Sequence, residues 1–175
     1  MSGAEDFPLR PFLPADTMAL RELFAQSIEE LTADDYDEEQ RIAWASAAAD
    51  ADAFAKRLGG MVTLIVQLDG EYLGFGSLKD GKVIDMLFVH PYYAGEGVGT
   101  ALADALEKIA AARGAASVTA EASDSAVAFF QARGYVQTQR NSIPCDDLWL
   151  SNTTMKKTLK VSEDKSAADA AKRLQ

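Results

Sequence analysis

The sequence predicts an α+β (mixed α/β) domain whose central, mostly antiparallel sheet has about six to seven strands and is flanked by about four helices. Three β-branched and apolar runs between residues 61 and 89 are separated by the tight-turn dipeptides Asp69-Gly70 and Asp80-Gly81, which predicts an antiparallel meander. Helical patterns of apolar residues precede and follow it. One helix separates strand 82–89 from strand 117–122, so we expect these two strands to run parallel.

Composition limits the classes of function. A net charge of −10 disfavours nucleic acid and favours cations such as amines. Cys145 is the only cysteine, which fits a reducing cytoplasm, and neither a membrane-spanning run nor a secretory leader is apparent. We therefore expect a cytoplasmic protein without membrane or nucleic-acid partners, and we allow for a homodimer. We expect a single domain over residues 1–160 and a polar tail over residues 161–175.

The N-terminal part is predicted to contain a short edge strand at 9–12 and a helix that Asp16 caps. The inward face of this helix carries apolar residues at helical spacing: Leu20, Leu23, Phe24, Ile28 and Leu31. The stretch 29–39 holds seven acidic residues and Tyr36. We interpret it either as a solvated loop or as an acidic wall that attracts an amine.

A second helical stretch is predicted over residues 38–58, with a break near Ala49-Asp50. After it comes the meander, whose last strand, 82–89, is apolar on both faces except at Asp85 and should be central in the sheet. A short helix that Ser123 or Asp124 caps should follow strand 117–122.

The C-terminal part is predicted to end in two strands, 135–142 and 148–157, which a wide loop around Pro144 joins.

Glycines at 95, 97 and 99 lie between strand 82–89 and the next helix. No lysine follows them as a P-loop requires, and Thr100 occupies the position of the third glycine of the dinucleotide-binding pattern. A helix start nevertheless presents free N–H groups and partial positive charge, and glycines let a phosphate approach them. The segment therefore predicts an anion site, most naturally for a pyrophosphate; the alternative is a turn that only reverses the chain.

Two motifs and the order of the elements resemble the GNAT acetyltransferase superfamily. The segment Ala94-Gly95-Glu96-Gly97-Val98-Gly99 is similar to the family pattern [QR]-x-x-G-x-[GA], with Ala94 in place of Gln or Arg. The segment 123–135 is similar to N-x-x-A-x-x-F-Y-x-x-x-G-[FY], with Ser123 for Asn and Phe130 for Tyr. The resemblance covers about residues 8–158 and is strongest to the small bacterial YafP-like branch.

This resemblance implies a parallel, splayed strand pair whose gap holds the acetyl-pantetheine arm of acetyl-CoA, and a glycine loop that holds the pyrophosphate with main-chain N–H groups. The implied coenzyme-binding residues are Leu87, Phe88, Val89, Ala94, Gly95, Glu96, Gly97, Val98, Gly99, Thr100, Ser123, Ala126, Phe129 and Phe130. The implied activity is direct transfer of the acetyl group to the amine of a small molecule or peptide. The alternative is a non-catalytic acyl-CoA-binding module, and no metal is expected.

Three tasks of this chemistry need candidate residues. Main-chain N–H groups near Phe88 and Val89 are the candidates for polarising the thioester carbonyl. Asp85 is the first candidate for the base, because desolvation raises the pKa of an unpaired carboxylate in an apolar strand; the alternative is a buried acid that neighbouring backbone or a basic side chain satisfies. Glu121 is the second candidate.

The leaving thiolate needs a proton that Phe130 cannot supply, so Tyr93 is the first candidate donor. Tyr92, Tyr36, Cys145 and solvent are alternatives. Tyr36 and Trp44 are expected to contact the cationic substrate.

Overall fold

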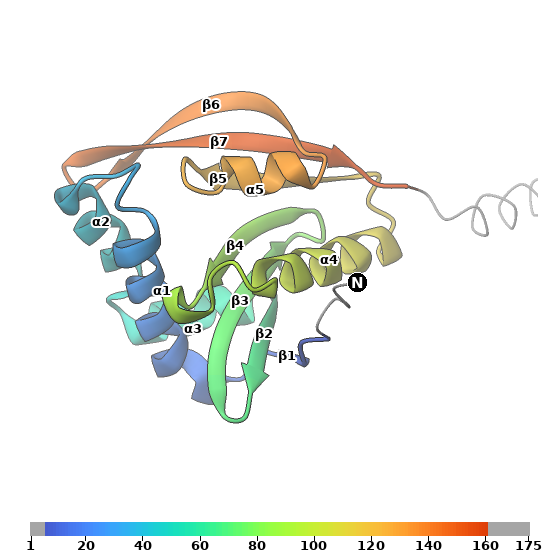
Figure 1. Ribbon diagram of the computed structural model, residues 1–175, viewed down its shortest axis with the longest axis horizontal. Helices are drawn as coiled ribbons and strands as arrows, with labels where there is room; N and C mark the ends of the chain where they lie inside the picture. The colour runs from blue at the N-terminus through green and yellow to red at the C-terminus, as the bar shows by residue number, and fades with distance from the viewer. Residues whose placement is uncertain (1–5, 161–175) are drawn as a thin grey trace, which may run out of the picture.

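The computed structural model describes residues 6–160 and contains one seven-stranded sheet with helices on both faces (Figure 1). The strand order is β1-β2-β3-β4-β5-β7-β6; every pair is antiparallel except β4 with β5. The predicted fold class is confirmed. The predicted tail at 161–175 lies outside the described residues.

The strands are β1 Leu9–Pro11, β2 Val62–Leu68, β3 Glu71–Lys79, β4 Val83–Val89, β5 Ser117–Ser123, β6 Val136–Cys145 and β7 Leu148–Thr158. The α-helices within the described range are α1 Thr17–Leu31, α2 Glu38–Ala45, α3 Ala51–Gly59, α4 Val98–Ala112 and α5 Val127–Ala132. The predicted helical stretch 38–58 is two helices, because the Asp50 side chain accepts a hydrogen bond from the Ala53 amide and starts α3. None of the described helices is long and apolar enough to span a membrane.

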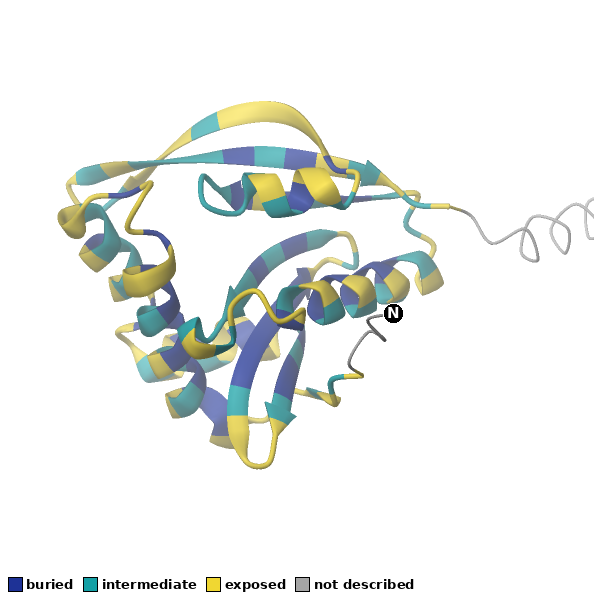
Figure 2. Ribbon diagram, in the orientation of Figure 1, coloured by how far each residue is buried: buried dark blue, intermediate teal, exposed yellow. Residues whose placement is uncertain are grey.

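The two faces of the sheet carry different helices. Phe24 of α1 and Phe54 of α3 pack with Phe75 of β3 on one face. On the other face, α4 and α5 pack against β3, β4 and β5 through residues such as Leu106 and Phe130. Figure 2 shows the buried residues of α1 and α4 on the sides that face the sheet.

Two glycines in β3 allow α4 to lie very close to the sheet. A Cβ at Gly74 would be 2.8 Å from Val98 Cγ1 and 3.0 Å from the Phe88 carbonyl oxygen. A Cβ at Gly76 would be 3.0 Å from Leu106 Cδ1. These separations are too short for a side-chain carbon, so the start of α4 has its position because β3 lacks side chains there.

β4 contains a β-bulge at Asp85. Ser77 of β3 pairs with Met86, but the next residue, Leu78, pairs with Ile84, so Asp85 is an extra residue in β4. Residues two apart normally share a face, yet Ile84 packs on the α4 side and Met86 on the α1 side. The bulge therefore turns Asp85 to the α1 face together with Met86.

The parallel pair β4–β5 is short. Only Val83 with Thr119 and Ile84 with Ala120 are in register. From Asp85 to Val89, β4 continues along β3 without β5 beside it, while β5 continues along β7. The strands therefore splay from the bulge onward, and Figure 1 shows β5 lying with β7 and diverging from β4.

Four details differ from the predictions. The β6–β7 connection is a tight turn at Asp146, where φ is 53°, and Pro144 lies within β6. An edge strand tolerates Pro because its outer N–H has no partner. Leu31 is exposed because it lies at the end of α1. Third, neither Ser123 nor Asp124 caps α5 with its side chain, since the cap residue is Ala126.

Asp16 is the fourth difference, because its side chain does not cap α1. Its carboxylate accepts hydrogen bonds from Arg10 at 2.7 and 2.8 Å and from the Tyr72 hydroxyl at 2.7 Å. The Arg10 hydrogen bonds in particular lower the pKa of Asp16 to about 2. This buried cluster fixes the chain before α1 against β3.

Gly74→Ala should lower the free energy of unfolding by roughly 1–3 kcal/mol, because the added carbon forces α4 away from β3. Urea unfolding followed by circular dichroism measures this. Gly59→Ala is the matched control, since a Cβ at Gly59 meets nothing within 4 Å and should leave the midpoint nearly unchanged. Equal midpoints for the two variants would contradict the close-packing argument.

Asp16→Asn should remove about 2 kcal/mol of stability at pH 7, as the pKa falls from a usual 3.8 to about 2 on folding. A depressed pKa stabilises the folded state above pH 4, and this stabilisation is lost as pH falls from about 4 through about 2. The wild-type chain should therefore lose its advantage over the variant in that window. Urea midpoints between pH 7 and pH 2 measure it, and a constant difference would count against the assignment.

Candidate active site

A cavity of about 390 Å³ lies where β4 and β5 separate. It brings together nine residues that the sequence had singled out: Tyr36, Trp44, Asp85, Leu87, Phe88, Glu121, Ser123, Ala126 and Phe130. Its volume is within the range of small-molecule sites. The residues come from both sides of the splay, so the cavity exists because the two strands diverge.

Asp85 faces this cavity and is paired with a basic side chain. Arg57 Nη2 of α3 donates a hydrogen bond to Asp85 Oδ2 at 2.9 Å. About a fifth of the Asp85 side chain is exposed, so the carboxylate also reaches the cavity's solvent. Of the two expectations for Asp85, the structure shows the paired carboxylate and not the isolated one, because the bulge turns Asp85 toward α3.

Glu121 of β5 is the second carboxylate in the cavity. Its neighbours Ala120 and Ala122 are buried on the α4 side, so Glu121 points to the opposite face, which is also the face of Asp85. Its carboxylate accepts a hydrogen bond from Thr154 Oγ1 at 2.9 Å. The splayed strands thus place one carboxylate each on the same side of the sheet.

Main-chain N–H groups of β4 point into the gap between the strands. The His90 amide donates to the Leu73 carbonyl at 2.8 Å, which identifies the edge of β4 that faces β3 at this point. Amides alternate in direction along a strand, so the Phe88 amide faces β3, and those of Leu87 and Val89 face the opposite edge. Pairing with β5 has already ended there, so neither amide meets a neighbouring strand.

The glycine segment forms an uncapped helix start. Gly95 and Gly97 have φ angles of 80° and 95°, a region that residues with a side chain rarely adopt. Gly97 is the cap residue of α4, and no side chain accepts a hydrogen bond from the first amides of the helix. Residues 94–97 are exposed, so these amides and the positive end of the helix dipole are open to an anion.

The second motif lies on the other side of the gap. Ser123 ends β5, and Ala126 caps α5; both line the cavity. Phe130 lines it too, packed edge-on against Phe129 and Tyr135. Phe129 itself lies outside the lining and contacts the start of α4, with its ring 3.6 Å from the position a Cβ at Gly99 would take.

Tyr36 and Trp44 form the α1–α2 side of the cavity. Their rings pack edge to face at 5.4 Å between centroids. The Tyr36 hydroxyl donates to the Ser151 carbonyl at 2.6 Å and accepts from the Asp124 amide at 2.9 Å, and burial raises its pKa. Tyr36 therefore connects the loop before α2 to β7 and to the end of β5.

Of the candidate proton donors, the structure places Tyr93 outside the cavity. Its hydroxyl donates to Glu71, and this hydrogen bond raises the pKa of Tyr93 to about 12. Tyr92 is 79% exposed and also outside. The Tyr36 hydroxyl already donates its hydrogen bond to the Ser151 carbonyl. Cys145 lines the cavity, and burial raises the pKa of its thiol.

Sequence reasoning missed Arg57 and, apart from the alternative donor Cys145, the β6–β7 hairpin. Arg57 had no signal beyond being a cation near the end of a helix, and its link to Asp85 spans 28 positions. Hairpin residues complete the lining: Ile143, Pro144, Cys145, Leu150, Ser151 and Asn152. Pro144, two residues after the predicted strand 135–142, is compatible with an edge strand but gives no sign of its place over the cavity.

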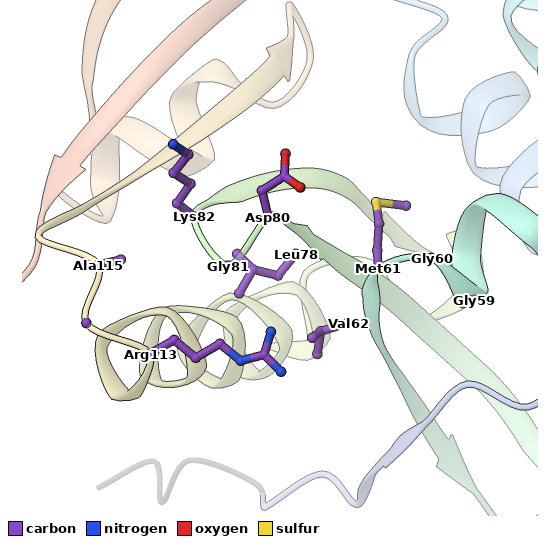
Figure 3. Close-up of a pocket in the computed structure, with 11 residues that line it drawn as sticks. Gly59, Gly60, Met61, Val62, Leu78, Asp80, Gly81, Lys82, Arg113 and Ala115 are labelled. Carbon is purple, nitrogen blue, oxygen red and sulfur yellow. The ribbon is translucent and has the colours of Figure 1, made fainter.

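A second hollow, of about 460 Å³, lies at the other end of α4 from the glycine segment (Figure 3). In Figure 3 the Arg113 side chain points toward Val62, whereas the side chains of Asp80 and Lys82 point away from Val62. Although this hollow is larger, it is shallow and contains none of the predicted site residues. Within residues 6–160, no cluster of three or more His, Cys, Asp or Glu residues is suited to hold a metal ion.

Comparisons with known proteins agree with this geometry. Residues 32–159 match the sequence model of the acetyltransferase (GNAT) domain. The chain is 27% identical over 148 residues to YafP, an uncharacterized N-acetyltransferase of Escherichia coli strain K12, covering 85% of this chain and 93% of that protein. This agrees with the expected resemblance to the YafP-like branch.

Solved structures give the same result. A GCN5-related N-acetyltransferase from Rhodopseudomonas palustris, whose name adds "aminotransferase, class-II", is 54% identical with a TM-score of 0.88, covering 91% of this chain and 99% of that one. PaiA N-acetyltransferase from Thermoplasma acidophilum, solved with coenzyme A, shares the fold at 19% identity and a TM-score of 0.69, covering 88% and 99%. The chain therefore belongs to the GNAT acetyltransferase family, a family of acyltransferase enzymes.

Proposed function

We propose that this protein transfers the acetyl group of acetyl-CoA to the amino group of a small molecule or peptide. The observation that carries the proposal is the combination of an uncapped, glycine-opened start of α4 with a splayed strand pair whose gap contains two carboxylates. Family membership and the coenzyme A complex of the Thermoplasma relative support the choice of co-substrate.

The glycine loop would bind the coenzyme's pyrophosphate. Residues 95–100 offer main-chain amides at the positive end of a 15-residue helix, and the left-handed Gly95 and Gly97 leave them uncovered. Ala94 has no side-chain hydrogen-bond donor where the family has Gln or Arg, so these backbone groups would carry the interaction. Ser123, Ala126 and Phe130 would line the pantetheine arm from the β5 side, and Phe129 would support the loop through its contact with Gly99.

The amides of Leu87 and Val89 are suited to polarise the thioester carbonyl. Both point into the gap without a strand partner, so they can donate to the oxygen as negative charge develops on it. The Phe88 amide belongs to the β3 side, and the ring of Phe88 packs against Phe24 instead, with 4.7 Å between centroids.

Asp85 is the proposed proton acceptor, and Glu121 is the alternative. A substrate ammonium must lose a proton before its nitrogen attacks the carbonyl carbon. The carbon–sulfur bond then breaks, and the electron pair leaves on the coenzyme thiolate. Arg57 holds the Asp85 carboxylate in the cavity, and Thr154 holds that of Glu121.

Tyr36 is the tyrosine in the cavity lining, and its hydroxyl already donates to the Ser151 carbonyl, so it is not a free donor for the leaving thiolate. Phe130 is buried in the position where the family often has Tyr, and the Tyr93 hydroxyl is bound to Glu71 outside the cavity. Coenzyme A thiolate is a tolerable leaving group, so we propose that it departs without a tyrosine donor and takes its proton from solvent. The absence of such a donor is expected to slow the reaction rather than abolish it.

Gly97→Ala should raise the dissociation constant for acetyl-CoA at least about tenfold, because the methyl group strains the left-handed residue and crowds the amides. Gly114→Ala is the matched control: it introduces the same strain at the other end of α4, where φ is 89°. Calorimetric titration compares the two. Equal affinities would overturn the loop assignment, and no binding by the wild-type chain would overturn the proposed function.

Asp85→Asn should lower kcat by about 10²-fold with little change in the dissociation constant for acetyl-CoA, since a general base contributes about 10²–10⁴-fold. Glu121→Gln tests the alternative in the same thiol-release assay. If only the Glu121 variant loses activity and pH dependence, the base is Glu121. An acetyl-CoA-binding chain that releases no thiol with any amine would identify a binding module instead.

A further inference from the structure

Large apolar side chains line the cavity on the side of α1, α2 and the β6–β7 hairpin, together with the polar residues Tyr36, Ser151 and Asn152. On these two walls, the helices and the hairpin, the largest apolar lining residues are Phe24, Trp44, Ile143, Pro144 and Leu150. The charged lining residues instead come from the strands β4 and β5 and from α3. A ligand in this cavity would therefore contact charged side chains of β4, β5 and α3 and apolar side chains of α1, α2 and the hairpin.

The charges of the lining suit one cation. Asp85 and Glu121 are the carboxylates among the described lining residues, and Arg57 already pairs with Asp85. The three together carry a net charge of −1, which one ammonium group balances. A second ammonium on the same ligand would lie against apolar side chains without a partner, and burying a charge in that way is costly.

Hydrogen bonds between the two walls limit the length of the ligand. Gln40 Nε2 of α2 donates to the Trp149 carbonyl at 3.0 Å, and the Tyr36 hydroxyl donates to the Ser151 carbonyl at 2.6 Å. These contacts join the start of α2 to β7 over a stretch of three β7 residues. A polypeptide that left the cavity on this side would have to break these hydrogen bonds and leave the carbonyls unsatisfied.

We propose, on the basis of the proposed function, that the acceptor is a small primary monoamine with an apolar or aromatic body. Its ammonium would lie between Asp85 and Glu121. Its carbon skeleton would pack against Trp44, Ile143 and Leu150. Polyamines and polypeptide amino groups are excluded as preferred acceptors by the single unbalanced charge and by the joined walls.

The experiment measures thiol release from acetyl-CoA with four amines: 2-phenylethylamine, ethylamine, spermidine and a short lysine-containing peptide. We expect kcat/KM for 2-phenylethylamine to exceed that for ethylamine by at least about tenfold, because apolar pocket contacts discriminate on that scale. It should also exceed the values for spermidine and the peptide. A higher kcat/KM for spermidine or for the peptide would overturn the inference while leaving acetyl transfer itself established.

A pair of variants tests whether the apolar wall causes this preference. Ile143→Asn puts a polar group into the lining and should lower kcat/KM for 2-phenylethylamine about tenfold, and that for ethylamine much less. Ile42→Asn is the control, because Ile42 is also solvent-exposed but lies on α2 outside the lining. Equal losses for both amines in Ile143→Asn would overturn the inference. Failure of the wild-type chain to bind acetyl-CoA would overturn the inference and the proposed function together.

Discussion

The β-bulge at Asp85 is the constraint on which the rest of the site depends. One extra residue in β4 places Ile84 on the α4 side of the sheet and Met86 on the α1 side, and it turns Asp85 toward Arg57. From this point β5 no longer pairs with β4. The same defect therefore opens the gap, leaves main-chain amides without partners, and supplies a carboxylate beside them.

A sheet that opens in its middle needs support elsewhere, and α4 provides much of it. The side-chain-free positions at Gly74 and Gly76 let α4 pack directly onto β3. Farther along α4, the buried carboxylate of Glu107 binds Arg133, which follows α5, and Lys157 of β7 at 2.6 Å. One helix thus connects both halves of the splayed sheet, and its free N-terminus lies next to the gap.

Charge acts at two scales in this protein. The net charge of −10 attracts cations over a distance and is screened by salt. Inside the cavity the balance is local, because Arg57 offsets one of the two carboxylates. The long-range field therefore favours cations of every kind, whereas on the proposed function the local charges and the apolar walls would select among amines.

The sequence by itself determined the order of the elements, because turn dipeptides such as Asp69-Gly70 and helical spacing are local signals. It also located the glycine segment, since the φ angles of Gly95 and Gly97 are a property of single residues. The sequence did not predict the contacts of Asp16 and Asp124. Their carboxylates bind arginines and do not cap α1 and α5. For the same reason Tyr93 was a reasonable candidate in sequence, although its hydroxyl binds Glu71 away from the cavity.

Only the tertiary structure decided which residues meet in the cavity. Arg57 and Asp85 are 28 positions apart in the sequence, and Tyr36 and Ser151 are 115 positions apart, so no local spacing predicts either contact. The bulge likewise depends on the register between β3 and β4, which the two strands establish together. Local signals specify elements, whereas the side chains that share a site are selected by pairing and packing between distant segments.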